Sequence, residues 1–176
     1  ATGTFAAGSI TLNSDGSVPG TVSEPATASG AIAIGAFRTR FAWDYELATP
    51  LTTRKSDGIG AGVPGNLANF SSRGPTRDGR TKPDLYAPGA YLAGSLSSDA
   101  TTTTIPTVDR DSGGLHAYLE GTSASAPVVS GILALLLQRN RLLLPSEVMA
   151  LLISTAATGG KVDAVALIGA VPIQVD

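Results

Sequence analysis

The sequence of 176 residues contains no cysteine, so it can form neither a disulfide framework nor a thiolate metal site. Charged residues make up only 15% of the chain, and the net charge of −2 provides no electrostatic attraction to nucleic acid or to an anionic membrane. No apolar run is long enough to span a bilayer, and the longest one is interrupted by Ser130 and Gly131. We therefore expect no nucleic-acid partner and no membrane span.

The chain also begins without an initiator methionine or a signal peptide, so we expect a processed or excised piece of a longer protein. The lack of cysteine permits an extracellular or secreted location, which we take as an expectation. An apolar content of 43% is sufficient for one domain with a hydrophobic core.

The chain is organised around a turn of small residues, Gly121-Thr122-Ser123. Residues 115–119 alternate in polarity as a half-buried strand does, and residues 128–137 are apolar on every face, as in a helix buried in a core. Ser123 is therefore expected at a helix N-terminus, beside unpaired backbone N–H groups. Such groups stabilise the oxyanion that forms when a serine attacks a carbonyl. The alternative interpretation is that Ser123 is only an N-cap.

The first half of the chain predicts strands and loops. Residues 31–37 form a continuous apolar run, which is typical of a parallel strand covered by helices on both faces. Residues 38–68 lack periodicity and predict a long surface excursion. Residues 85–87 predict a short strand that Pro88-Gly89 stops.

Further along, residues 90–96 predict a strand that pairs with the one at 115–119. Between them lies a polar loop, 97–114, of a length that is usually functional or mobile. A second helix is predicted over 145–156, with Glu147 near its positive end, and a short last helix over 163–168.

Four stretches, in order along the chain, resemble the subtilisin-like serine proteases (subtilases): residues 23–36, 70–89, 121–127 and 160–164. The resemblance implies an α/β fold, a three-layer subtilisin-like arrangement of a parallel sheet between helices, of which this chain holds the C-terminal half. By this resemblance residues 19–176 are the C-terminal part of the peptidase domain. Residues 1–18 are then the end of an inserted β segment or a linker.

The same resemblance implies site residues. Ser123 matches the family's nucleophile and its backbone oxyanion donor, while Ser23 and Thr122 match positions that border the substrate pocket. Glu24-Pro25 matches a place where the family has a cis peptide bond.

Two motifs of the family are absent, namely those that carry the catalytic aspartate and histidine. The only histidine, His116, lies seven residues before Ser123 on the adjoining predicted strand. Because that stretch spans about seven times 3.3 Å, we interpret His116 as a strand-face residue and not as the base. The family's oxyanion asparagine is also missing; Asn13 is a candidate substitute, with an ordinary turn asparagine as the alternative.

No cofactor is assigned from the sequence. The resemblance allows structural calcium in the complete domain, but the spacing of the acidic residues matches no specific ligand loop, and we interpret them as solvated charges. The residues concerned are Asp78, Asp84, Asp109 and Asp111.

We therefore expect a serine endopeptidase that hydrolyses peptide bonds of a peptide or protein substrate through a Ser123 acyl-enzyme. The aspartate and histidine of the triad come from outside this chain, so the chain alone is expected to be inactive. Its partner is the complementary N-terminal half of the domain, or a second copy of itself. The alternative is a non-catalytic pseudo-protease or assembly module; an esterase of another fold is excluded because no Gly-x-Ser-x-Gly motif surrounds Ser123.

Overall fold

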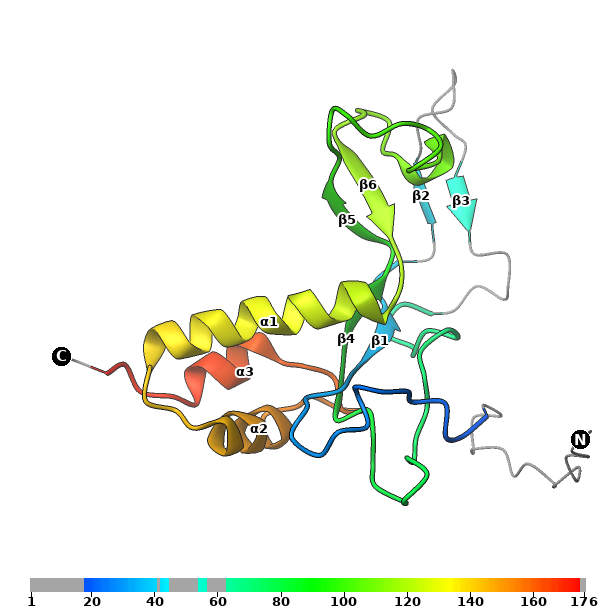
Figure 1. Ribbon diagram of the computed structural model, residues 1–176. Coiled ribbons are helices and arrows are strands. Elements are labelled where there is room, and N and C mark those ends of the chain that lie inside the picture. The colour runs from blue at the N-terminus through cyan, green and yellow to red at the C-terminus, as the bar shows by residue number, and fades with distance from the viewer. Residues whose placement is uncertain (1–17, 41, 45–53, 57–62, 175–176) are drawn as a thin grey trace, which may run out of the picture.

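The computed structural model describes residues 18–40, 42–44, 54–56 and 63–174 (Figure 1). Asn13 and nearly all of the proposed N-terminal segment 1–18 lie outside the described residues. The elements in chain order are β1 (Ile34–Arg38), β2 (Ala42–Asp44), β3 (Arg54–Ser56), β4 (Leu85–Ala90), β5 (Leu92–Ser95), the 3-10 turn η1 (Thr107–Asp109), β6 (His116–Leu119), α1 (Thr122–Arg139), α2 (Pro145–Ser154) and α3 (Ala164–Gly169).

A parallel pair of strands, β1 and β4, lies at the centre, with Ile34 opposite Leu85. The predicted parallel strand in the apolar run 31–37 is therefore confirmed, although it begins later, at Ile34. The prediction that Pro88-Gly89 stops the next strand is wrong, because β4 continues to Ala90. The register shifts between Phe37 and Arg38, opposite this stretch, and proline is tolerated at such irregular pairings.

Two antiparallel pairs accompany this centre. Strands β5 and β6 form one of them, with Leu92 opposite Leu119, which confirms the pairing predicted from sequence. Strands β2 and β3 form the other, within the stretch predicted to be an irregular excursion. The loop after β5 has hydrogen bonds of its own, since the Arg110 guanidinium donates to the carbonyl oxygens of Ile105 (3.1 Å) and Ala100 (3.0 Å).

The three helices lie together beside the parallel strands and share one core with them (Figure 1). Helix α2 begins at Pro145 as predicted, where the Glu147 carboxylate accepts a 2.8 Å hydrogen bond from the Leu144 N–H. Asp163 caps α3 by accepting from the Ala166 N–H. The buried members of this core are Leu85, Ala87, Val129, Leu136, Val148, Leu152, Leu167 and Val171. The fold is thus α/β, as predicted.

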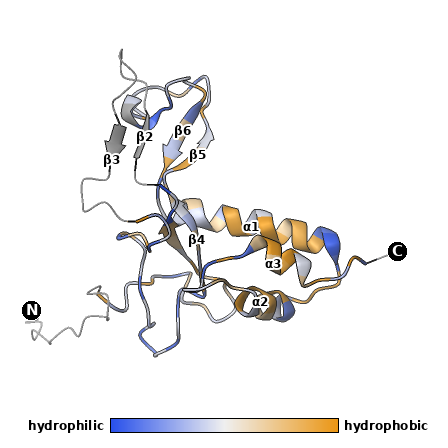
Figure 2. Cartoon of the chain, turned by 180° about the vertical axis from the view of Figure 1, so that it is seen from behind, coloured by the Kyte–Doolittle hydropathy of each residue, from blue (hydrophilic) through white to orange (hydrophobic). Residues whose placement is uncertain are grey.

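Helix α1 is apolar along most of its length (Figure 2). Its buried residues, Ser125, Val129 and Leu136, nevertheless lie on one side. Val129 and Leu136 face the core, whereas the side chains of Leu135 and Leu137 are 53% and 39% exposed. The prediction of a helix buried on every face is therefore wrong for this chain. The reason is that the described residues supply packing partners on one side only, from β1, β4 and α3. Among the described residues, no helix has the length and hydropathy that a bilayer-spanning segment needs.

Candidate active site

Ser123 is the second residue of α1, and Gly121 is the N-cap. The predicted position at a helix N-terminus is confirmed, and the interpretation of Ser123 as the N-cap is wrong. Gly121 has a φ of 137°, a conformation that favours glycine. The capping position is held by a residue without a side chain, and no side-chain hydrogen bond caps this helix start within the described residues.

The turn that carries Ser123 is fixed to the end of β4. The N–H of Gly121 donates a 2.8 Å hydrogen bond to the carbonyl oxygen of Gly89. Ser125 is fully buried, and its hydroxyl donates to the carbonyl oxygen of Ala87 at 3.3 Å. A β-carbon added at Gly89 would lie 2.0 Å from the Ser125 Oγ atom. Strand and helix are thus in contact at a place where no larger residue fits.

Ser123 itself is exposed and lines a cavity of about 350 Å³. The other walls of this cavity, which we call the Ser123 cavity, come from β5, from the end of β6 and from Pro127. The Ser123 N–H belongs to the first turn of the helix, whose N–H groups have no carbonyl partner within the helix. A hydroxyl and an adjacent backbone donor at the positive end of a helix are two of the groups that attack on a carbonyl uses, beside a base.

The two predicted pocket residues lie in different places. Thr122 is half-buried and directly precedes Ser123 at the start of α1. Ser23 is exposed and lines a separate cavity of about 480 Å³ with residues of the 76–80 loop. The predicted cis peptide bond between Glu24 and Pro25 is confirmed next to it.

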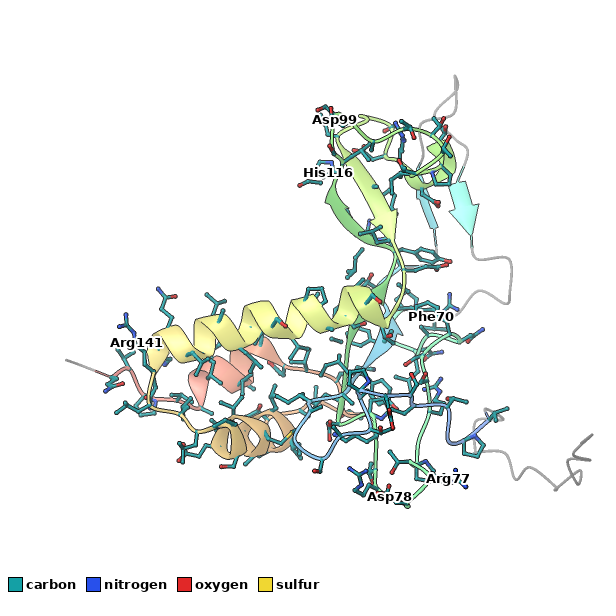
Figure 3. The ribbon with its side chains drawn as sticks, viewed as in Figure 1. Phe70, Arg77, Asp78, Asp99, His116 and Arg141 are labelled. Carbon is teal, nitrogen blue, oxygen red and sulfur yellow. The ribbon has the colours of Figure 1, made fainter. Side chains whose placement is uncertain are left out.

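His116 lies towards the end of the β5–β6 hairpin that is remote from α1, near Asp99 (Figure 3). Its Nδ1 atom is 3.2 Å from a carboxylate oxygen of Asp111. The backbone N–H groups of Leu115 and His116 donate to the other oxygen. The N–H of His116, above all, holds the pKa of Asp111 below its usual range. His116 therefore belongs to a hydrogen-bonded turn and is not brought to Ser123.

The acidic residues weighed as calcium ligands have partners within the protein. Asp78 accepts a 2.5 Å hydrogen bond from Thr76 and a 2.8 Å bond from Arg80, which together lower its pKa to about 2. Asp84 is 2.7 Å from the buried ammonium of Lys82. In the part of the chain that the structure describes, no group of three or more metal-binding side chains occurs.

Several residues around Ser123 are not among the predicted site residues. Gly89 and Ser125 fix its turn, whereas the sequence was interpreted at Pro88-Gly89 only as the end of a strand. Leu119 and Glu120 line the Ser123 cavity at the end of β6. No local pattern marks them, because the cavity is formed by segments that are far apart in sequence.

The sequence pattern of the subtilase family matches residues 3–170 of this chain. An uncharacterised protein of Aquifex aeolicus is 35% identical over 133 residues, which are 76% of this chain and 53% of that protein. The serine protease AprX of Bacillus subtilis is 41% identical over 86 residues, 49% of this chain and 19% of that protein. The chain thus spans about half the length, or less, of these relatives.

Solved structures of proteases share the fold. The CspB protease of Clostridium perfringens matches 86% of this chain and 28% of its own, with a TM-score of 0.58 and 24% identity. Fervidolysin, a keratinolytic enzyme of Fervidobacterium pennivorans related to subtilisin, matches 87% of this chain and 21% of its own, with a TM-score of 0.53 and 26% identity.

Proposed function

Because this chain belongs to the subtilase family, we propose that it carries the nucleophile of a serine endopeptidase and that this nucleophile is Ser123. One observation carries the proposal: an exposed serine hydroxyl lies on the first turn of a helix whose cap is a glycine, at the wall of a cavity. Peptides and proteins are the substrate class that goes with the family.

In the proposed reaction, the Ser123 Oγ atom attacks the carbonyl carbon of a peptide bond while a base takes its proton. The carbonyl oxygen gains negative charge, which the Ser123 N–H and the positive end of α1 stabilise. The C–N bond then breaks, the base returns the proton to the leaving amine, and an acyl-enzyme remains on Ser123. Water hydrolyses this ester and restores the hydroxyl.

The base and the acid that orients it come, in this proposal, from outside the chain. The only histidine of the sequence is His116, and its ring is paired with Asp111. The missing groups would be supplied by the complementary N-terminal half of the domain, seated on the exposed surface of α1, whose two flanks carry Leu135 and Leu137. A second copy of this chain is the other partner that could cover this apolar surface of α1.

Residues 19–176 then form the C-terminal part of the peptidase domain, with 1–18 as a preceding insert or linker. Thr122 would border the substrate beside the nucleophile. Ser23 would contribute from the separate cavity that it lines. Structural calcium in a complete domain and an extracellular location stay predictions from the sequence.

A non-catalytic role is the second candidate. The motifs of the catalytic aspartate and histidine are absent from the sequence, and the only histidine is held at the remote end of a hairpin. A pseudo-protease that uses this fold for binding needs neither group.

Hydrolysis of an unstructured protein such as casein by the whole protein that contains this chain separates the two candidates. We expect Ser123→Ala to reduce the rate by at least roughly a thousandfold. Ser130→Ala is the matched control, because Ser130 is an exposed serine of the same helix whose hydroxyl donates to the Ala126 carbonyl oxygen. If the Ser123→Ala variant and the unmodified protein hydrolyse casein at equal rates, Ser123 is not the nucleophile and the non-catalytic role is the better candidate.

A further inference from the structure

Strand β5 forms an open edge of the β5–β6 hairpin. Leu92 lies opposite Leu119, and the N–H of Leu96, one residue past the strand, donates a 2.9 Å hydrogen bond to the carbonyl oxygen of Leu115 in the same register. In an antiparallel pair only alternate residues bond to the partner strand. The backbone groups of Leu92, Gly94 and Leu96 therefore point towards β6.

Ala93 and Ser95 alternate with those residues, so their N–H and C=O groups point away from β6. Both residues are exposed, and in the part of the chain that the structure describes none of these four backbone groups has a hydrogen-bond partner. From Leu92 to Ser95 the strand also lacks the charge, the proline or the bulge with which proteins protect an edge. It thus offers two donors and two acceptors to another extended chain.

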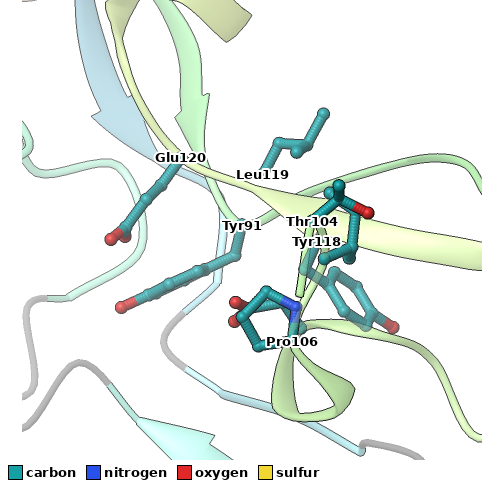
Figure 4. Close-up of a pocket in the computed structure, with 8 residues that line it drawn as sticks. Tyr91, Thr104, Pro106, Tyr118, Leu119 and Glu120 are labelled. Atoms are coloured by element: carbon teal, nitrogen blue, oxygen red, sulfur yellow. The ribbon is translucent and has the colours of Figure 1, made fainter. Parts of the chain in front are cut away.

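The other edge of the hairpin, on β6, is covered by the loop before it. The N–H of Asp111 donates a 2.9 Å hydrogen bond to the carbonyl oxygen of His116. Thr104 and Pro106 line a second cavity, of about 250 Å³, together with Tyr118 of β6 (Figure 4). Among the described residues, β5 is therefore the edge of this hairpin that can accept a further strand.

The open edge of β5 borders the Ser123 cavity. Ala93 lines this cavity together with Leu92, Gly94 and Ser123 itself. A residue with outward-pointing backbone groups therefore lies at the cavity that holds the proposed nucleophile. Because an extended peptide advances about 3.3 Å per residue, a peptide paired with Ala93 places its neighbouring residues at the same cavity.

We propose that a peptide substrate binds in extended form along the outer edge of β5, as a third strand of the hairpin, with the bond to be cleaved at Ser123. This inference rests on the proposed function, since it takes the bound peptide to be the substrate of Ser123. The backbone groups of Ala93 and Ser95 hold the peptide backbone whatever its sequence. The apolar walls of the Ser123 cavity contact the side chains next to the bond.

A second copy of this chain is the other strand that an open edge attracts. The edge of β5 has only two residues with outward-pointing backbone groups, and Gly94 between them adds no side chain to an interface. A stable dimer buries about 800 Å² on each partner, which so short an edge does not supply. A substrate needs only weak, reversible binding, and a few backbone hydrogen bonds beside the nucleophile provide it.

Peptide binding to the whole protein tests the inference. The background variant is Ser123→Ala, so that binding is measured whether or not the protein hydrolyses peptides. The probe is a fluorescent eight-residue peptide of alternating valine and threonine, and polarisation gives its dissociation constant. Ala93→Pro removes one outward donor, and proline is tolerated where the N–H of an edge strand faces outward. We expect it to weaken binding roughly two- to tenfold, the effect of one lost backbone hydrogen bond.

Two further changes locate the effect. Ser95→Pro removes the second outward donor and should weaken binding by a similar factor. Ser98→Pro is the matched control in the same hairpin, because Ser98 is the second residue of a turn that the Ala100 N–H closes on the Ser97 carbonyl oxygen, where proline is favoured. This variant should bind the probe as the background does.

The probe itself supplies a test that leaves the protein unchanged. With every amide N-methylated it has no donors, and we expect it to bind roughly tenfold more weakly or worse. The inference is overturned if the whole protein does not bind the probe, if both β5 proline variants bind it as the background does, or if the methylated probe binds equally well. It is also overturned if Ala93→Pro changes only the sedimentation of the protein, since the edge then pairs with a second copy. Failure to hydrolyse casein, with binding that depends on β5, would count against the proposed function alone.

Discussion

The carbonyl oxygen of Gly89 accepts a 2.8 Å hydrogen bond from the N–H of Gly121, which joins the end of β4 to the start of α1. These two glycines lie 32 positions apart in the sequence. The position of Ser123 therefore depends on a strand that carries none of the proposed catalytic groups.

Gly89→Ala tests this junction. The added β-carbon would lie 2.0 Å from the Ser125 Oγ atom and 2.6 Å from the Ala36 Cβ atom, so we expect a loss of about 1–3 kcal/mol in the free energy of unfolding. Gly131→Ala is the control, because nothing lies within 4 Å of a β-carbon there and alanine favours the helix by about 0.5–1 kcal/mol. Urea unfolding should show opposite shifts of the midpoint; equal small shifts would mean that the junction is not tightly packed.

The sequence predicted the elements that have a strong local pattern. The start of α2 at Pro145, the short last helix after Asp163 and the pairing of β5 with β6 were all predicted from the patterns of the segments that form them. It mispredicted the end of β4 at Pro88, because an irregular register absorbs the proline. It also predicted burial on all sides of α1, because the helix is apolar all round. The described residues cover one side of it only, so Leu135 and Leu137 stay exposed.

The candidate site was predicted only in part for a similar reason. The turn at Ser123 has a local pattern and is found at the helix start. The cavities beside it are made by Tyr91, Leu92 and Glu120 together with a loop between them. Contacts of this kind depend on the fold and leave no periodic signal in the sequence.

Lys82 and Asp84 form an ion pair that should matter for stability. The ammonium of Lys82 lies 2.7 Å from the Asp84 carboxylate and also donates to the Ala31 carbonyl, and the two side chains are only 5% and 13% exposed. Lys82→Met would leave the carboxylate without its counter-ion, and we expect a loss of about 3–5 kcal/mol. Thermal and urea unfolding would measure it.

The comparison for that variant is Arg80→Gln. Arg80 pairs with Asp78 at 2.8 Å, but both side chains are well exposed. Exposed pairs are screened by water, so this change should leave the unfolding midpoint nearly unaltered. A loss as large as that of Lys82→Met would contradict the burial argument.

Asp111 should make the β5–β6 hairpin sensitive to acid. Its folded pKa is depressed, chiefly by the hydrogen bond from the His116 N–H, so its contribution is present above the unfolded pKa of about 3.9 and is lost as the pH falls through the folded pKa. We expect Asp111→Asn to speed amide exchange of His116 at neutral pH, by an amount equivalent to less than about 1 kcal/mol. The difference from the unmodified protein should shrink below pH ~4; a difference that grows there would reverse the sign assigned here.

The exposed side of α1 should drive association of the isolated chain. Leu135 and Leu137 leave apolar surface uncovered among the described residues, and proteins normally cover such surface. Changing both to glutamine should shift sedimentation towards the monomer, whereas Val165→Gln on α3, where the side chain is 85% exposed, should not. A chain that is monomeric at high concentration without these changes would argue against the half-domain interpretation.

The central claim is that Ser123 is a nucleophile whose base lies outside this chain. A positioned base contributes roughly 10²–10⁴-fold and an aligned oxyanion donor roughly 10²–10³-fold, and this chain supplies Ser123 with a backbone donor but with no histidine. The most direct measurement is the rate of labelling by a fluorophosphonate, with peptide mapping of the adduct and Ser130→Ala as the control. We predict an adduct on Ser123 in the whole protein or with the complementary half added, and labelling no faster than that of a free serine in the isolated chain. Rapid labelling of Ser123 in the isolated chain, or no adduct on Ser123 in the whole protein, would contradict the account.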